Sequence, residues 1–213
     1  MEKCFLSIET SLERIFLVLY GKEKLYSKSK NLDRSIEIEI NTMFENILAQ
    51  ANLRFADLDY ILVSLGPGSY TGTRVGLAAA KAIAVSINKP ILGYTNFEAI
   101  YNQALIEGLI EKTNTSGIII KANKNDCYYQ EIDNNFYLDT KVLNLDNIQK
   151  AISKKSLTVG NYSKLSVLED YHYCLPKKES IFNIYLSKIK SIHRIKEKEL
   201  EPLYIRGHYA DKQ

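Results

Sequence analysis

The chain has 213 residues, of which 46% are hydrophobic and 25% are charged, and its formal net charge is +3 at pH 7. These values describe a globular protein of one large or two small domains, and so mild a positive charge does not by itself indicate a nucleic-acid partner. No run of 18 apolar residues and no secretory signal pattern is present, so we expect a cytoplasmic protein that has no membrane partner.

The three cysteines, Cys4, Cys127 and Cys174, are widely spaced and form no C-x-x-C motif. An odd number without paired spacing indicates neither a disulfide framework nor a thiolate zinc site. His172 and Cys174 share one face of a short predicted strand, but no second pair of ligands accompanies them. We therefore expect buried thiols and no metal site.

The first half of the chain predicts the element order β-β-β-α-β-α-β. Three strands come first, and Gly21 is expected to turn the second into the third as an antiparallel hairpin. The first helix has apolar residues at the i, i+4 and i+7 positions, and Thr95 and Glu98 form a capping box that opens a third helix. The predicted strands cover residues 3–8, 14–20, 24–27, 60–65 and 91–94, and the first two helices cover residues 35–52 and 73–88.

The second half repeats this order in shortened form. A β-β-β-α-β-α unit that occurs twice is typical of two ribonuclease-H-like lobes in tandem, the actin-like ATPase arrangement of the α/β fold class. We expect an N-terminal lobe of residues 1–95 and a smaller C-terminal lobe of residues 96–213, whose last segment can pack back on the first lobe. The predicted strands are 117–122, 127–132, 136–142, 157–160 and 171–174, with helices near 146–154 and over Ile181, Ile184, Tyr185, Ile189 and Ile192.

A glycine-rich turn connects the buried strand 60–65 to the second helix, with the sequence LGPGSYTG. It is not a P-loop, because Gly72 is followed by Thr and Arg, and the G-x-G-x-x-x-G spacing of Gly66, Gly68 and Gly72 fails the dinucleotide fingerprint. Ser69 lacks the flanking glycines of a nucleophile elbow. The turn is either a tight connection or a place where backbone N–H groups bind an anion.

The helix after this turn is apolar on nearly all sides. Only Arg74, Lys81 and Asn88 interrupt the apolar residues, so we expect it to be buried on more than one side, and Gly76 and Ala80 would let a second helix approach closely. This indicates a protein interface, unless the preceding helix or the second lobe covers that face. A cation in the first helical turn is disfavoured by the helix dipole, so Arg74 is expected to have an acidic or phosphate partner or a local salt bridge.

The sequence Glu9-Thr10-Ser11 ends the first strand, where kinases and ATPases of this fold place an acid and hydroxyls around phosphate and metal. Glu9 can equally be a residue of a hairpin turn. A ribonuclease-H-type nuclease also needs an acid at the end of the fourth strand, and Ser64-Leu65-Gly66 supplies none.

The residues 59–84 resemble the D-x-(apolar)-G-P-G-S-F-T-G-x-R-x-G signature of the TsaB (YeaZ) family, with Tyr70 in place of Phe. Weaker matches in the same order are residues 8–11, 122–128 and 201–206. The related TsaD family is much longer and binds its metal through an H-x-x-x-H motif, whereas residues 95–103 contain no histidine. The resemblance is therefore to TsaB, the non-catalytic partner in bacterial threonylcarbamoyl-adenosine tRNA modification.

This resemblance implies a scaffold subunit that binds TsaD, the transferase acting on the adenosine next to the anticodon of tRNAs that read A-starting codons. It also implies TsaE in the larger assembly, a homodimer when alone, indirect contact with tRNA, no catalytic residue, and no cofactor of its own, with ATP or ADP only at the level of the complex. The alternative is a weak ATPase or a glycoprotease-type peptidase. Separately, Ser69 could act as a nucleophile with His172, His193 or His208, although nothing in the sequence fixes their geometry.

The resemblance assigns two sets of residues. Pairing in the family uses the first two helices, which here carry Ile36, Ile40, Met43, Phe44, Arg74, Gly76, Leu77, Ala80, Lys81 and Ala84. A nucleotide would be bound by Glu9, Thr10, Ser11, Gly66, Gly68, Ser69, Thr71 and Gly72. Glu9 replaces the family's Asp, and Asn123 and Asp126 stand where Arg and Glu are usual, which weakens the nucleotide assignment but not the helical one.

Overall fold

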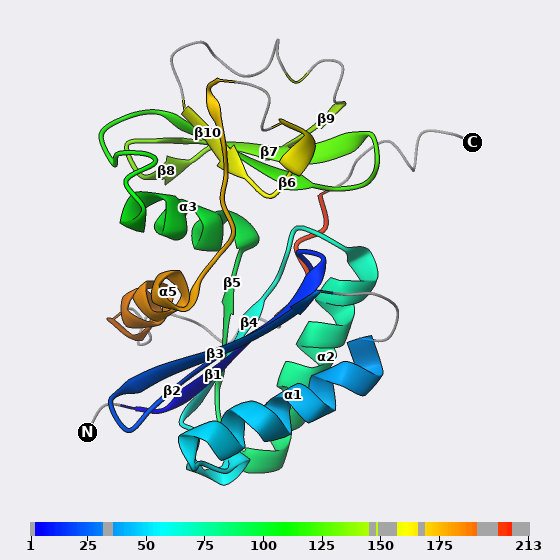
Figure 1. Ribbon diagram of the computed structural model, residues 1–213, viewed down its shortest axis with the longest axis vertical. Helices are drawn as coiled ribbons and strands as arrows, with labels where there is room; N and C mark the ends of the chain where they lie inside the picture. The colour runs from blue at the N-terminus through cyan, green and yellow to red at the C-terminus, as the bar shows by residue number, and fades with distance from the viewer. Residues whose placement is uncertain are drawn as a thin grey trace.

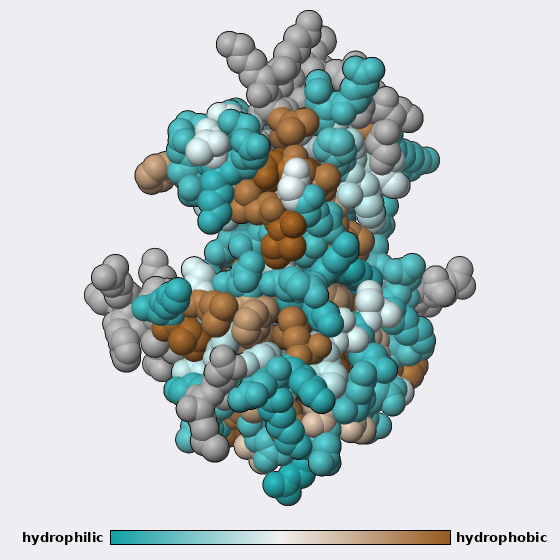
Figure 2. Space-filling model, turned by 60° about the vertical axis from the view of Figure 1, so that its left-hand side comes forward, coloured by the Kyte–Doolittle hydropathy of each residue, from teal (hydrophilic) through white to brown (hydrophobic). Residues whose placement is uncertain are grey.

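Two mixed β-sheets, one from each half of the chain, form the framework of the computed structural model (Figure 1). The structure describes residues 3–31, 36–144, 148, 157–165, 169–190 and 200–205. The space-filling view shows two lobes that meet at a narrower waist (Figure 2). Within the described residues, no helix combines the length and the apolar character that a membrane span requires.

The first sheet has the strand order β3-β2-β1-β4-β5. Its first three strands are antiparallel neighbours, and β4 and β5 run parallel to β1. Gly21 is the last paired residue of β2, and the turn itself consists of Lys22 and Glu23, which both have positive φ. The strands are β1 (Phe5–Glu9), β2 (Arg14–Gly21), β3 (Lys24–Asn31), β4 (Tyr60–Ser64) and β5 (Ile91–Tyr94).

Helices cover both faces of the first sheet. The helices α1 (Ile36–Ala51) and α2 (Tyr70–Ile87) pack on one face, and the short helix η1 (Phe55–Asp57) lies in the connection from α1 to β4. Helix α5 (Lys178–Lys190) comes from the other end of the chain and packs on the opposite face. Because β1, β2 and β4 are buried on both faces, their sequences are continuous apolar runs rather than alternating patterns.

The second sheet has the order β11-β10-β6-β7-β8, with β9 also paired to β7. Helix α3 (Asn96–Ile106) packs on its inner face and against α5, so that α3 and α5 lie between the two sheets (Figure 1). The short helix η2 (Ser163–Leu165) connects two strands. The strands are β6 (Ser116–Lys121), β7 (Asp126–Asp133), β8 (Phe136–Tyr137), β9 (Lys141–Asn144), β10 (Leu157–Gly160) and β11 (Tyr171–Tyr173).

The predicted α/β fold class with two tandem lobes is confirmed, and one strand prediction was wrong. Residues 136–142 form two short strands, because the Gln130 side-chain amide donates to Leu138 O and Thr140 Oγ1 between them. The predicted helix near 146–154 lies outside the described residues except for Ile148, as does Ile192 of the last predicted helix.

The segment 200–205 lies against the first lobe. Leu200 packs against the core under α1 and α2, and Leu203 N donates to Leu65 O at 2.7 Å. A Cβ added to Gly93 would lie 2.9 Å from Leu200 Cδ2, so the bare glycine lets the segment approach β5 closely. Residues from the end of the chain thus flank the start of α2.

Candidate functional site

The glycine turn and the β1–β2 turn are in direct contact. Ser69 N donates to Ser11 O at 2.8 Å, and Thr10 Oγ1 donates to Gly72 O at 2.6 Å. A Cβ on Gly68 would lie 2.5 Å from Ser11 O, and one on Gly72 would lie 2.1 Å from Thr10 O. The space that the glycines open is therefore filled by the neighbouring turn of this chain.

Glu9 is fully buried at the end of β1 and organises the turn that follows it. Its Oε1 accepts hydrogen bonds from Ser11 N at 2.5 Å, Ser11 Oγ at 2.9 Å and Leu12 N at 3.0 Å. Its Oε2 lies 3.8 Å from Arg14 Nε. The carboxylate that was predicted to bind a nucleotide thus accepts three hydrogen bonds from its own hairpin through Oε1, whereas its buried Oε2 has no hydrogen-bond partner among the described residues and lies beside Arg14.

Burial dominates the electrostatics of this pair. It raises the pKa of the Glu9 carboxyl, while Arg14 and the three hydrogen bonds act in the opposite direction. Burial also lowers the pKa of Arg14, whose guanidinium lies 4.2 Å from the centroid of the Phe16 ring and donates to Pro176 O at 2.6 Å. Arg14 therefore supplies the positive charge opposite Glu9 and connects the hairpin to the segment before α5.

Asn96, which the sequence analysis did not single out, joins the turns of the first lobe to α3. Its Nδ2 donates to Ser11 Oγ at 2.7 Å and to Pro67 O at 2.8 Å, while its Oδ1 accepts from Ser64 Oγ at 2.7 Å. Its backbone N donates to Gly66 O at 2.7 Å. The capping box of Thr95 and Glu98 was predicted, and the only signal for Asn96 was its position as the first residue after that cap.

Ser69 is the N-cap of α2, since its Oγ accepts from Gly72 N at 3.3 Å. The helix begins at Tyr70, one turn earlier than predicted, so Thr71 and Gly72 lie in its first turn and Arg74 in its second. Of the histidines considered as partners for Ser69, His193 and His208 lie outside the described residues, and His172 lies in β11 of the second sheet.

Among the described residues, Arg74 contacts two tyrosines and forms no salt bridge, so the expected acidic or phosphate partner stays a prediction. The Arg74 guanidinium lies 3.7 Å from the centroid of the Tyr70 ring, and its Nε donates to Tyr204 Oη at 3.0 Å. Aromatic rings can hold a cation over their faces, so the two tyrosines hold the Arg74 guanidinium in place near the helix N-terminus. Tyr204 comes from the end of the chain, which no local sequence pattern could associate with α2.

Helix α2 has a buried side and an exposed side. Gly76, Leu77, Ala80 and Ala84 face the sheet, and a Cβ on Gly76 would lie 2.4 Å from Thr10 Oγ1. The exposed side carries Arg74, Ala78, Lys81, Ala82 and Val85. Val85 is 81% exposed. Arg74 and Lys81 mark the exposed side in the sequence. The sequence analysis did not single out Ala78, which lies between them on the same side.

Helix α1 is divided in the same way. Ile40, Met43 and Phe44 are buried against the sheet, while Ile36 is half-buried and Ile38 is 72% exposed. Of the residues predicted to form a partner interface, only Arg74 and Lys81 are therefore exposed in this chain.

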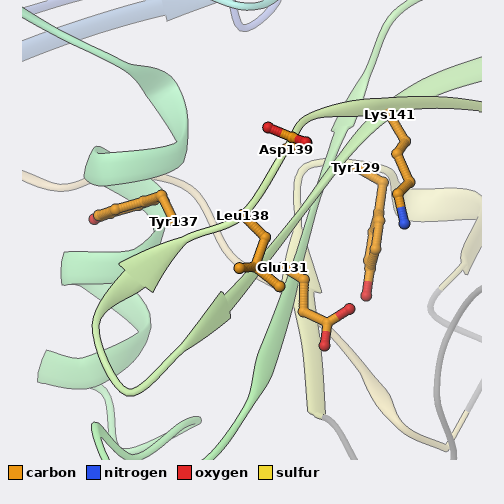
Figure 3. Close-up of a pocket in the computed structure, with 6 residues that line it drawn as sticks. All are labelled: Tyr129, Glu131, Tyr137, Leu138, Asp139 and Lys141. Atoms are coloured by element: carbon orange, nitrogen blue, oxygen red, sulfur yellow. The ribbon is translucent and has the colours of Figure 1, made fainter.

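A pocket of about 400 Å³ lies on the second sheet, where β7, β8 and β9 meet (Figure 3). Tyr129 and Glu131 come from β7, and Tyr137 of β8 points away from Tyr129. Leu138, Asp139 and Lys141 complete the lining. Within the part of the chain that the structure describes, no three His, Cys, Asp or Glu side chains are grouped to hold a metal ion.

Comparison with known proteins places residues 30–187 in the family model described as "TsaD: tRNA N6-adenosine threonylcarbamoyltransferase". The chain is 27% identical over 170 residues to the tRNA threonylcarbamoyladenosine biosynthesis protein TsaB of Buchnera aphidicola subsp. Schizaphis graminum, covering 76% of this chain and 80% of the relative. It is 23% identical over 228 residues to TsaB of Escherichia coli K12, covering 98% and 96%. The structure of YeaZ from Pseudomonas aeruginosa superposes with a TM-score of 0.78 at 16% identity, over 96% of this chain and 100% of that one.

Proposed function

The chain belongs to the TsaB family of tRNA threonylcarbamoyladenosine biosynthesis proteins, and from this premise we propose that it is a non-catalytic subunit that binds a TsaD-type transferase. In this role it supports the transfer of a threonylcarbamoyl group to tRNA by its partner, in an assembly that also contains TsaE. The proposal implies a cytoplasmic protein that contacts tRNA through the complex, and a homodimer on the same face when the transferase is absent.

The exposed side of α2 is the observation that carries this proposal. Val85 is 81% exposed, Ala78 and Ala82 are exposed, and Ile38 of the neighbouring helix α1 is 72% exposed. The small side chains of Ala78 and Ala82 let the backbone of a second helix come close, and exposed apolar residues such as Ile38 and Val85 are typical of protein interfaces. The α1–α2 face, defined by these four residues, is the proposed docking face.

The β1–β2 turn supports a role without chemistry of its own. Glu9 Oε1 accepts three hydrogen bonds from this turn, Thr10 Oγ1 is bonded to the first turn of α2, and Ser11 Oγ contacts both Glu9 and Asn96. A ligand that binds through Glu9 Oε1, Thr10 Oγ1 or Ser11 Oγ would have to displace these protein contacts. The sequence from 95 to 103 also lacks the histidines of the H-x-x-x-H motif that the transferase uses.

The test is co-elution of the purified chain with the TsaD protein of its own organism in size-exclusion chromatography. We expect the wild-type chain to co-elute, Ala78→Glu to elute separately while keeping a wild-type melting temperature, and Leu138→Glu to behave as the wild type. Leu138 is the matched control because it is an exposed apolar residue on the second lobe. Failure of the wild-type proteins to associate would contradict the proposal.

A reconstituted reaction tests the supporting role. With TsaD, TsaE, tRNA and threonylcarbamoyl-adenylate present, omission of this chain should abolish modification of the tRNA, and Ala78→Glu should restore little of it. ATP turnover by the chain alone that is abolished by Glu9→Gln would instead support the weak ATPase alternative.

A further inference from the structure

An exposed cluster of two tyrosines and one arginine lies at the start of α2. The rings of Tyr70 and Tyr204 are 5.9 Å apart and these residues are 58% and 52% exposed. Arg74 is exposed, with its guanidinium 3.7 Å from the Tyr70 ring and its Nε bonded to Tyr204 Oη at 3.0 Å. Three large side chains thus order one another at the surface instead of entering the core.

The residues just before Tyr204 are held against the first lobe. Leu203 N donates to Leu65 O at 2.7 Å, and Leu200 packs against the core of the first lobe beside Gly93. An aromatic residue that is already ordered loses little conformational entropy when a partner covers it. Tyr204 has an exposed ring on an anchored backbone, and both properties favour binding of a partner.

Arg74 connects this cluster to the exposed side of α2. Lys81 lies seven residues further on, which corresponds to about 10 Å along the helix, and α2 contains no acidic residue. Arginine and tyrosine dominate the binding energy of many interfaces, and an arginine held flat by aromatic rings is prepared to bind a carboxylate in a bidentate manner. The positive, acid-free stripe therefore fits a partner helix that presents carboxylates.

We propose that Tyr70, Arg74 and Tyr204 form the anchor of the docking face, and that they receive an acidic helix of the TsaD-type transferase with one carboxylate at Arg74 and another at Lys81. The segment 200–205 is then a part of the docking site, although it is far from α2 in the sequence. This inference rests on the proposed function and assigns to it the residues and the charge of the contact.

The first test measures the affinity of the full chain for the transferase by calorimetry. We expect Tyr204→Ala to weaken binding by about 30-fold, and Tyr204→Phe to weaken it only a few-fold, because the ring is kept and one hydrogen bond is lost. Tyr173→Ala is the control, since Tyr173 is 49% exposed on β11, and it should bind as the wild type. Equal melting temperatures of the variants will show that folding is unchanged.

The second test concerns the charge. Binding of the wild type should weaken as salt is added, and Arg74→Gln should both weaken binding and reduce this salt dependence, whereas Lys164→Gln, at an exposed lysine of η2, should do neither.

The outcomes separate the inference from the proposed function. If the wild type does not bind the transferase, the proposed function fails. If the wild type binds and Tyr204→Ala binds equally well, the inference that Tyr204 anchors the docking face is overturned while the proposed function stands. If Tyr204→Ala abolishes only the self-association of this chain, the occupant is a second copy and the inference is likewise overturned.

Discussion

Asn96 and Ser11, which are 85 positions apart in the sequence, are joined by a hydrogen bond of 2.7 Å from Asn96 Nδ2 to Ser11 Oγ. Through Ser11 the bond reaches Glu9, and through its other contacts Asn96 reaches Ser64 and Pro67. One buried amide therefore ties the β1–β2 turn and the glycine turn to the first residue of α3. This connection sets the position of the start of α2, where the proposed docking face begins.

Removal of this amide should destabilise the chain strongly. We expect Asn96→Ala to lower the free energy of unfolding by about 2–4 kcal/mol, because it leaves buried hydroxyl and carbonyl groups without partners. Asn102→Ala is the control, since Asn102 Nδ2 makes one partly buried bond to Glu98 O and should cost about 1 kcal/mol or less. Urea unfolding measures both, and equal losses would contradict the role given to Asn96.

A side chain at Gly72 should separate the two turns. The Cβ of Gly72→Ala would lie 2.1 Å from Thr10 O, so the backbone must shift, and we expect a loss of more than about 2 kcal/mol. Gly108→Ala tests backbone conformation alone, because Gly108 has a φ of +67° and no atom within 4 Å of an added Cβ. Its expected cost is about 1 kcal/mol. Thermal melts compare the two, and a Gly72→Ala variant as stable as Gly108→Ala would refute the close contact.

The two sides of α2 should respond differently to the same substitution. Gly76→Glu places a charge against Thr10 and the core, so we expect it to abolish cooperative unfolding. Ala78→Glu places the charge in solvent and should melt as the wild type does. Circular dichroism during heating distinguishes them. A cooperative, wild-type-like transition for Gly76→Glu would show that this position is not enclosed.

The buried Glu9 should make stability depend on pH. Because burial raises its pKa in the folded state, the folded protein holds this proton at a pH where the unfolded chain has released it. The contribution of Glu9 is therefore complete below the unfolded value of 4.5 and declines as pH rises through the folded value.

The difference in unfolding free energy between the wild type and Glu9→Gln isolates this effect. We expect that difference, wild type minus variant, to fall as pH rises from 4.5 upwards. Denaturant titrations over a pH series measure it. A difference that increases with pH would mean that Arg14 and the hydrogen bonds outweigh burial.

The three thiols should differ in reactivity. Burial raises the pKa of Cys127 and of Cys174 to about 12, whereas Cys4 is only half-buried. Since the thiolate is the reactive form, iodoacetamide at neutral pH should label Cys4 in the folded chain and all three cysteines in urea. Mass spectrometry of the digested protein reads out the sites, and rapid labelling of Cys127 or Cys174 in the native state would contradict the burial.

Local sequence patterns determined the elements of this protein and their order. Apolar runs marked β1, β2 and β4, the capping residues Thr95 and Glu98 marked the start of α3, and the repeated element order indicated two lobes. These features depend on residues within a few positions of one another, so each can be recognised without knowledge of the rest of the chain. The signature around the glycine turn likewise identified the family.

Only the tertiary structure decided which side of each element faces the core and which distant segments meet. An almost wholly apolar helix does not reveal its buried side, and contact with the sheet placed Gly76 and Ala80 inside and Ala78 and Val85 outside. The partner of Arg74 is Tyr204, 130 positions away. Contacts of that separation arise from the packing of the whole chain, and no local propensity encodes them.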